Sequence, residues 1–259
     1  ITAENITFNG NGFWIASGQN VSGIYSNKFN TTVRHANISM GIGTDGNGIN
    51  LVSGANNATI FNNTFGSQFR GILLTDVRSS VFERNNFSYS CKNCYAIFTI
   101  NASFNNFTLN VLNGTNQTTH GFLLRDGSNN NILQSNIGRM EIGIGIGSLN
   151  SSHNRFFLNI GISRNTSCIT HTDVNNITII SDNGTATGGD GSINSHHGIR
   201  LFNVSDSTFT SITASSNSSS GLSIQDSSNN TFNLAKGVSN VSGGIRVENS
   251  SNIVFTNNT

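Results

Sequence analysis

Three residues that could carry catalysis lie close together in the sequence: Asp190, His197 and Arg200. A neutral imidazole can remove the proton next to a carboxylate, and a guanidinium can stabilise the negative charge that develops there. Asp190 could orient the imidazole, so the set fits a lyase or epimerase that acts on uronic-acid polysaccharides. The simpler interpretation, which we favour, is that His196 and His197 begin an exposed strand, and it leaves the chain without a catalytic residue.

The sequence contains few of the carboxyl groups that other catalytic sites and metal sites need. Glycoside hydrolysis needs two carboxyl groups across a cleft, and calcium needs several oxygen ligands that include carboxylates. The chain has only 12 acidic residues, and many of them fall at predicted turns. We therefore expect no metal and no dissociable cofactor.

The three cysteines fall into a pair and a single residue. Cys91 and Cys94 lie in the loop before a predicted strand, and in an exported protein they could close a tight disulfide. A zinc site would need a second pair of ligands at suitable spacing, which the sequence lacks. Cys168 begins an apolar strand and is expected to be a buried, unreactive thiol.

The element that must position these residues is a short repeat, Gly-Ile-x-Leu and its variants, which recurs about every 23 residues where no insertion intervenes. A second apolar residue follows ten positions after the first. Each unit therefore holds short runs of alternating apolar residues, which are typical of strands rather than helices. The clearest copies begin at Gly48, Gly71, Gly121, Gly198, Gly221 and Gly244.

Stacked in register, these units predict an all-β fold: a single right-handed parallel β-helix of about nine or ten coils over residues 1–259. Weaker copies of the repeat at Ile97 and Ile169 lie between the clearest ones. The coil that begins near Ile169 is clearly longer than the others. Its extra loop contains Asp190 and His197. We expect one elongated domain that is part of a longer chain or a subunit that stacks on others.

Polar residues recur at two further positions of the repeat. The residue four after the first apolar position is Asp or Asn in most coils, as in Asp76, Asn101 and Asp126, where its side chain can bond the backbone at a corner. A second polar column three residues later, with Asn229 and Asn252, predicts an amide ladder between coils. Most of the Asp residues therefore have a structural explanation.

Composition limits the partners. Only 10% of the residues are charged, the formal net charge is +1, and Lys and Arg form no basic stripe, so no nucleic acid is expected. No apolar run is long enough to span a membrane, so no membrane span is expected in this chain. Both ends of a β-helix expose unpaired backbone, and the expected partners are glycans and further copies that stack end to end or laterally.

Asn-x-Ser/Thr triplets occur about twenty times, and each is a potential N-glycosylation acceptor. A chain so rich in Asn, Ser and Thr generates many of them by chance, so only part of them is expected to be occupied. Covalent N-glycans would solubilise a surface poor in charge and would indicate an extracellular or cell-surface location. The candidate acceptors are Asn5, Asn20, Asn30, Asn37, Asn57, Asn62, Asn86, Asn106, Asn113, Asn116, Asn150, Asn165, Asn183, Asn217 and Asn240.

The order Gly-Ile-x-Leu, then Asp/Asn-Ser-Ser-Asn-Asn, then Thr-Phe, as from Gly221 to Phe232, resembles the repeats of the NosD-like or carbohydrate-binding and sugar-hydrolase (CASH) family of parallel β-helices. The resemblance covers nearly the whole chain and implies the fold. For function it implies less, because members of this family include polysaccharide lyases, epimerases, phage tailspikes and surface proteins. The Asp-Pro-His triplet of alginate epimerases cannot occur in a chain without Pro. The density of sequons is most similar to archaeal surface glycoproteins.

Two functions follow from these observations. The favoured one is a non-catalytic extracellular structural glycoprotein that serves as a cell-surface, sheath or filament module. The alternative is a carbohydrate-active or glycan-binding β-helix, such as a polysaccharide lyase, an epimerase or a tailspike-like protein, with a groove of aromatic and charged side chains. Only Trp14, Tyr25, Tyr89 and Tyr95 are left as obvious sugar-stacking residues outside the predicted core, which favours the structural role.

Overall fold

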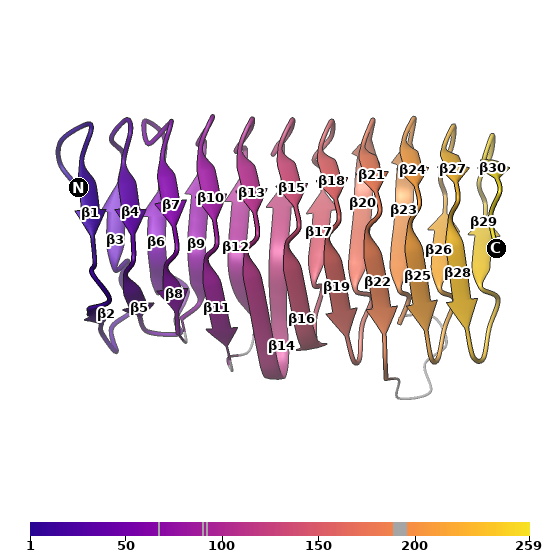
Figure 1. Ribbon diagram of the computed structural model, residues 1–259, viewed down its shortest axis with the longest axis horizontal. Coiled ribbons are helices and arrows are strands. Elements are labelled where there is room, and N and C mark those ends of the chain that lie inside the picture. Colours follow the sequence, from indigo (N-terminus) through magenta and orange to yellow (C-terminus); the bar gives the residue numbers. More distant parts are fainter. Residues whose placement is uncertain (67, 90, 92, 189–195) are drawn as a thin grey trace.

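A computed structural model describes residues 1–66, 68–89, 91, 93–188 and 196–259, without the side chains of residues 116–119. The described chain is all β and winds through about ten turns, and every paired strand runs parallel to its partners. Figure 1 shows the turns side by side along one axis, with the two ends of the chain at opposite ends of the solenoid. The predicted parallel β-helix is confirmed.

Three parallel sheets, named A, B and C, line the solenoid (Figure 1). Sheet A consists of β1 (Thr7–Asn9), β4 (Thr32–Arg34), β7 (Thr59–Phe61), β10 (Val81–Glu83), β13 (Asn106–Thr108), β15 (Ile132–Gln134), β18 (Arg155–Phe157), β21 (Thr178–Ile180), β24 (Thr208–Thr210), β27 (Thr231–Asn233) and β30 (Val254–Thr256). Sheet B consists of β2 (Trp14–Ala16), β5 (Asn37–Ser39), β8 (Thr64–Phe65), β11 (Asn86–Tyr89), the first part of β14 (Val111–Arg125), β16 (Ile137–Ile142), β19 (Ile160–Ser163), β22 (Asn183–Ala186), β25 (Thr213–Ser216) and β28 (Lys236–Ser239). Sheet C consists of β3 (Ile24–Ser26), β6 (Asn47–Leu51), β9 (Arg70–Thr75), β12 (Cys94–Ile100), the last part of β14, β17 (Ile146–Leu149), β20 (Ile169–Asn175), β23 (Ile199–Ser205), β26 (Leu222–Gln225) and β29 (Ile245–Glu248).

The core is a set of apolar columns that run along the axis. In sheet C, Ile49, Ile72 and Ile97 lie in register on successive strands and are at most 1% exposed. In sheet A, the rings of Phe82 and Phe107 stack with centroids 4.9 Å apart. Each buried side chain of this size contributes about 2 kcal/mol through burial, so a thin column repeated in every coil stabilises the whole solenoid.

A buried amide ladder fills the corner between sheets A and B. Each asparagine accepts hydrogen bonds through its Oδ1 from the backbone N–H and the Nδ2 of the asparagine one coil earlier, and its own Nδ2 also donates to a backbone carbonyl. These bonds satisfy polar groups that would otherwise be costly to bury. The ladder runs through Asn63, Asn85, Asn110, Asn136, Asn159 and Asp182.

The exposed corners use left-handed backbone. Asp76 and Asn101 have φ of 57° and 48°, a region that Asp and Asn tolerate better than most residues. The Asn101 Nδ2 donates to the Asp76 Oδ1 at 2.6 Å across the coils, and the Asn252 Nδ2 donates to the Asn229 Oδ1 at 2.9 Å. The polar columns of the repeat are therefore ladders as well as corner residues.

Candidate functional site

The outer face of sheet C holds the described side chains best suited to chemistry. Register brings Arg70, Tyr95 and His120 into one column across β9, β12 and β14, although each lies a full coil from the next in the sequence. Phe98 and Arg125 lie in neighbouring columns of the same strands. We call these five residues the Arg–aromatic cluster.

Arg70 is held in place from several sides. Its Nη1 donates to the Thr44 carbonyl at 2.9 Å and to the Asn47 Oδ1 at 3.3 Å. The guanidinium carbon lies 4.4 Å from the ring centre of Phe69 and 5.3 Å from that of Phe98, which is the geometry of cation–π contacts. Burial lowers the pKa of Arg70 from its usual value, and nearby Tyr95 and Asp45 counter this effect. The fixed guanidinium stays charged, since arginine retains its proton in proteins.

Phe98 is the centre of the cluster. Its ring is only 5% exposed, although it lies on the outer face, because Arg70, Tyr95 and Arg125 cover it. The Tyr95 ring centre lies 4.6 Å away and the Arg125 guanidinium carbon 5.8 Å away. Arg125 also forms an exposed ion pair with Asp126 at 3.3 Å. Two guanidinium groups therefore flank one aromatic patch.

Tyr95 and His120 form the stacked ring pair of the cluster. Their rings are stacked with centres 5.0 Å apart and planes inclined by 26°. Burial lowers the pKa of His120 from its usual value of 6.5, so the imidazole is neutral at neutral pH. The Ile144 N–H donates to His120 Nδ1 at 3.4 Å, which favours the tautomer that carries its proton on Nε2.

Unsatisfied polar atoms concentrate on this face. Among the described residues, five buried side-chain nitrogen or oxygen atoms have no hydrogen-bond partner. Four of them belong to outer-face residues of sheet C: Asn50 Oδ1, Arg70 Nε, Arg125 Nε and Thr170 Oγ1. The fifth, Nε2 of His171, belongs to a core residue of the same sheet. Native proteins rarely leave such groups without partners, so this face differs from the ladder between sheets A and B, where the buried polar groups are paired.

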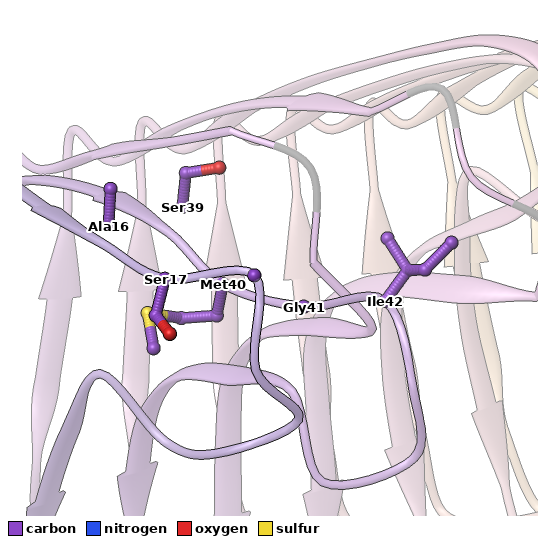
Figure 2. A pocket seen from close by; sticks show the side chains of 7 residues that line it. Ala16, Ser17, Ser39, Met40, Gly41 and Ile42 are labelled. Atoms are coloured by element: carbon purple, nitrogen blue, oxygen red, sulfur yellow. The ribbon is translucent and has the colours of Figure 1, made fainter.

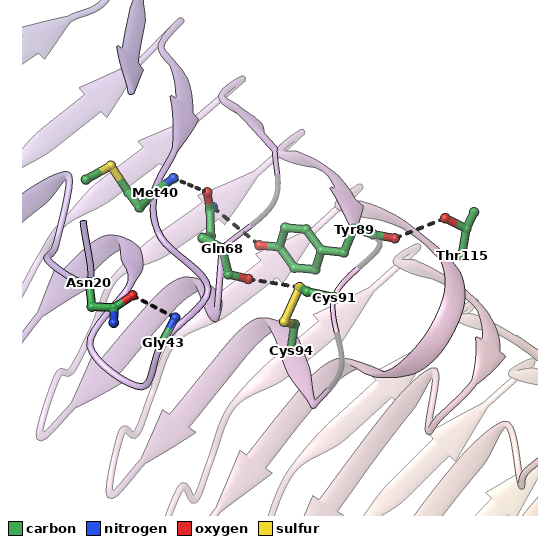
Figure 3. Close-up of a disulfide and its surroundings, with 8 residues drawn as sticks. All are labelled: Asn20, Met40, Gly43, Gln68, Tyr89, Cys91, Cys94 and Thr115. Atoms are coloured by element: carbon green, nitrogen blue, oxygen red, sulfur yellow. Dashed lines mark hydrogen bonds between the residues drawn. A yellow bond between two sulfur atoms is a disulfide. The ribbon is translucent and has the colours of Figure 1, made fainter. Parts of the chain in front are cut away.

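A disulfide joins Cys91 and Cys94 at the start of β12 (Figure 3). Cys94 directly precedes Tyr95, so the disulfide closes the loop that leads into the Arg–aromatic cluster. Gln68 lies beside it, and its side chain accepts from the Met40 N–H at 3.3 Å and donates to the Tyr89 hydroxyl at 3.5 Å (Figure 3). Tyr89 is 1% exposed, so the expectation that it is a sugar-stacking residue is wrong.

Two of the three catalytic candidates from the long coil, His197 and Arg200, lie together in the structure. Ile169 pairs with Ile199, which confirms that this coil is longer than its neighbours. His197 and Arg200 line one cavity with Ser223, Gln225, Arg246 and Glu248, and Asp190 lies outside the described residues. His196 and His197 are only 2% and 3% exposed, so the interpretation that they begin an exposed strand is wrong. The cavity lies three coils from the Arg–aromatic cluster on the same face of sheet C.

A larger cavity of about 630 Å³ lies near the N-terminal end between the first two coils (Figure 2). Its walls are small or aliphatic side chains and backbone, as Ala16, Ser39 and Ile42 illustrate. None of its lining residues is titratable or aromatic, and a binding site for a polar ligand needs convergent polar groups. Size alone therefore does not make it the candidate site.

The candidate glycosylation residues all lie at the surface where their side chains are described. Ten are exposed and four, namely Asn30, Asn37, Asn106 and Asn165, are half-buried, while the side chain of Asn116 is outside the described set. None of the buried ladder asparagines begins a sequon. N-glycosylation remains a prediction.

No group of three His, Cys, Asp or Glu residues that could hold a metal ion occurs in the part of the chain that the structure describes. The same part contains no helix with the length and apolarity of a membrane span. Cys168 is buried, and burial raises the pKa of its thiol to about 12.

Three solved structures share this architecture. The periplasmic alginate epimerase AlgG, in a mutant form, matches with a TM-score of 0.68 and 13% identity over 88% of this chain and 60% of its own. The A-module of the mannuronan C-5 epimerase AlgE6 of Azotobacter vinelandii matches with a TM-score of 0.60 and 12% identity over 92% and 75%. The catalytic domain of a GH87 alpha-1,3-glucanase matches with a TM-score of 0.55 and 16% identity over 99% and 63%. The likeness is one of fold.

These neighbours correct two expectations. The favoured function, a non-catalytic structural glycoprotein, and the expectation that the chain is not an enzyme are both wrong, because the neighbours are epimerases and a glucanase and favour the carbohydrate-active alternative. No family model matches the chain, and no curated protein matches it. The finer resemblance to NosD-like repeats and archaeal surface glycoproteins therefore remains a prediction.

Proposed function

We propose that the outer face of sheet C binds an anionic, uronate-containing polysaccharide and that the Arg–aromatic cluster exchanges the proton at C5 of a bound sugar. The main support for this proposal is that two guanidinium groups flank an aromatic patch beside a stacked tyrosine and neutral histidine. Arginine recognises carboxylates through its fork of N–H donors, and aromatic rings stack on sugar faces.

The chemistry follows from these groups. Tyr95, in its deprotonated form, would take the C5 proton and become a phenol, and His120, which carries a proton on Nε2, would give one to C5 or to the departing C4 oxygen and regain it from water. Arg70 and Arg125 would stabilise the charge that develops on the carboxylate. Return of a proton to the opposite face inverts C5. Departure of the C4 glycosidic oxygen instead breaks the chain and leaves a C4–C5 double bond. Either outcome starts from the same deprotonated intermediate.

Hydrolysis is less well supported by the same residues. A glycosidase needs two carboxyl groups that face each other across the scissile bond. The Arg–aromatic cluster contains no carboxyl group, and its nearest acids, Asp45 and Asp126, lie beside Arg70 and Arg125 as exposed counter-charges. Of the activities that the structural neighbours are named for, the epimerases agree best with this composition.

The test is proton exchange at C5. Polymannuronate would be incubated with the protein in D2O, and C5 deuteration and unsaturated product would be followed by NMR and ultraviolet absorbance. We expect deuteration with the wild-type protein and a loss of at least about 100-fold in Arg70→Gln and Tyr95→Phe. Arg84→Gln is the matched control, because Arg84 also lies over a phenylalanine ring, that of Phe61, but away from this face. Failure of the wild-type protein to exchange C5 protons in polymannuronate or polygalacturonate would overturn the proposal.

We also propose that the protein acts outside the cytoplasm and carries N-glycans on part of its surface asparagines. A disulfide forms and persists in oxidising compartments, and AlgG is named as a periplasmic protein. Glycopeptide mapping of the natively purified protein tests this proposal. Glycans at Asn113 and Asn183, both exposed, are expected, and an unmodified mass of 27.6 kDa would contradict it.

A further inference from the structure

A second cationic site lies towards the C-terminal end of sheet C. A cavity of about 240 Å³ is lined by His197, Arg200, Ser223, Gln225, Arg246 and Glu248. Register places Arg200, Ser223 and Arg246 in one outer-face column of β23, β26 and β29. The two guanidinium groups therefore flank a serine hydroxyl and lie two coils apart.

The charges of this cavity leave one cation unpaired. Arg246 is balanced by Glu248, whose Oε1 lies 3.0 Å from its Nη2. Arg200 has no ion pair with any described residue and packs over the Phe202 ring at 5.5 Å. His197 Nδ1 lies 3.1 Å from the Ser219 Oγ and 3.3 Å from the Ser220 carbonyl oxygen, so the ring is fixed at the edge of the cavity. A carboxylate on a ligand would pair with Arg200.

One outer-face column of sheet C connects the two sites. The column that contains Phe98 in the Arg–aromatic cluster continues through Leu123, Gly147 and Thr170 to Arg200. Gly147 and Thr170 are buried within this column, and the side chains of Ile144 and Leu123 lie beside Gly147. Three coils separate Arg125 from Phe202 in the adjacent column, which corresponds to about 14 Å at the spacing of neighbouring strands.

We propose that the cavity around Arg200 is a second anion subsite, which takes the carboxylate of a sugar residue several units away from the one at the Arg–aromatic cluster. The proposal rests on the proposed function, because it assumes that a uronate polymer lies on this face. A polymer held at both points gains affinity through its effective concentration at the second site. Short oligomers reach only one of the two sites.

Calorimetric titration with mannuronate oligomers of two and of ten sugar units tests the inference. We expect the decamer to bind the wild-type protein at least about tenfold more tightly than the dimer. Arg200→Gln should remove most of that difference and leave dimer binding unchanged. Arg155→Gln is the matched control, because Arg155 lies over the Phe157 ring at 5.1 Å on sheet A, and it should change neither affinity.

The outcomes separate the inference from the proposed function. Equal affinity for the two oligomers, or an unchanged decamer affinity in Arg200→Gln, would overturn the second subsite even if C5 exchange is observed. A length effect that depends on Arg200, in a protein that exchanges no C5 protons, would overturn only the catalytic proposal. Absence of binding by either oligomer would overturn both.

Discussion

Two polar regions of this solenoid differ in whether their buried polar groups have hydrogen-bond partners within the fold. In the ladder between sheets A and B, Asn136 is fully buried, its Oδ1 accepts from the Asn110 N–H and Nδ2, and its own Nδ2 donates to the Phe107 carbonyl and the Asn159 Oδ1. On the outer face of sheet C, Arg70 and Thr170 each keep a buried polar atom without a partner. The polar groups of the ladder are satisfied within the fold, whereas we propose that the accessible guanidinium N–H groups of Arg70 and Arg125 pair with a ligand.

This contrast separates structural from functional residues without reference to conservation. The ladder asparagines recur in five successive coils, from Asn63 to Asn159, because they complete one another. The members of the Arg–aromatic cluster occur in only three adjacent coils, on β9, β12 and β14. A substitution should therefore affect stability in the first region and ligand binding in the second.

The largest effect is expected where the ladder ends in an acid. Asp182 accepts from the Asn159 N–H at 2.8 Å and is 1% exposed, and burial raises its pKa from 3.8 to about 7. Because the folded state holds the proton more tightly than the unfolded state, stability is highest below about pH 4 and falls as the pH rises towards 7. A shift of this size corresponds to about 4 kcal/mol.

Asp182→Asn should remove this pH dependence and raise the free energy of unfolding at pH 8. By analogy with the other ladder residues, the new amide would donate to the carbonyl of Phe156, which lies one coil beyond Leu133. Urea unfolding at pH 5 and pH 8 measures the effect, with the exposed Asp173→Asn as the control. Equal pH dependence in the wild-type protein and Asp182→Asn would show that the ladder does not end in a neutral acid.

The second-largest effect on stability is expected for a residue inside the ladder. Asn136→Ala removes a side chain that accepts two hydrogen bonds and donates two, and it leaves buried partners unsatisfied. The free energy of unfolding should fall by about 3 kcal/mol. Dimer affinity measured at a temperature well below unfolding should stay within about twofold of wild type, and a large loss of affinity would break the proposed division between the two regions.

On the outer face, a substitution should change ligand affinity more than stability, and the change in free energy should be smaller than in the ladder. Arg70→Gln should weaken binding of the mannuronate dimer by about 30-fold, because charged hydrogen bonds are worth about 2 kcal/mol. Its free energy of unfolding should fall less than that of Asn136→Ala, because the two hydrogen bonds that Arg70 loses come from a half-exposed guanidinium and are weakened by solvent. Normal binding combined with a large loss of stability would assign Arg70 to the fold instead.

The smallest effect is expected at Thr170, whose hydroxyl has no partner in the folded protein. Thr170→Val keeps the shape of the side chain and should raise the free energy of unfolding by up to about 1 kcal/mol, because no unsatisfied hydroxyl is buried. Decamer affinity should stay within about twofold of wild type, because the buried hydroxyl is closed to a ligand. A destabilised Thr170→Val protein would mean that the hydroxyl is satisfied within the fold.

The fold could be predicted from the sequence because every coil repeats the same pattern. Ile72 and Phe122 occupy equivalent positions, and both are buried in the same core column. The long coil was also predictable, from the distance between Ile169 and Ile199. The buried amide ladder was missed, although its signal was present: Asn85 and Asn110 each stand three residues after a core phenylalanine.

The candidate site was harder to predict. His120 has no chemical partner among its neighbours in the sequence. Its partner in the structure, Tyr95, lies one full coil earlier. A separation equal to one repeat was the available signal. The break in alternation within β12, where Ala96 and Ile97 are both buried between the outer-face residues Tyr95 and Phe98, could not be predicted from an alternating pattern. That irregularity decides which side chains reach the outer face.

The most direct test of the proposed carbohydrate site is a crystal structure of the protein soaked with hexamannuronate. We expect sugar density on the outer face of sheet C, with a carboxylate within hydrogen-bonding distance of Arg70 or Arg125. Ordered sugar on sheet A or sheet B, with the outer face of sheet C empty, would contradict the proposal.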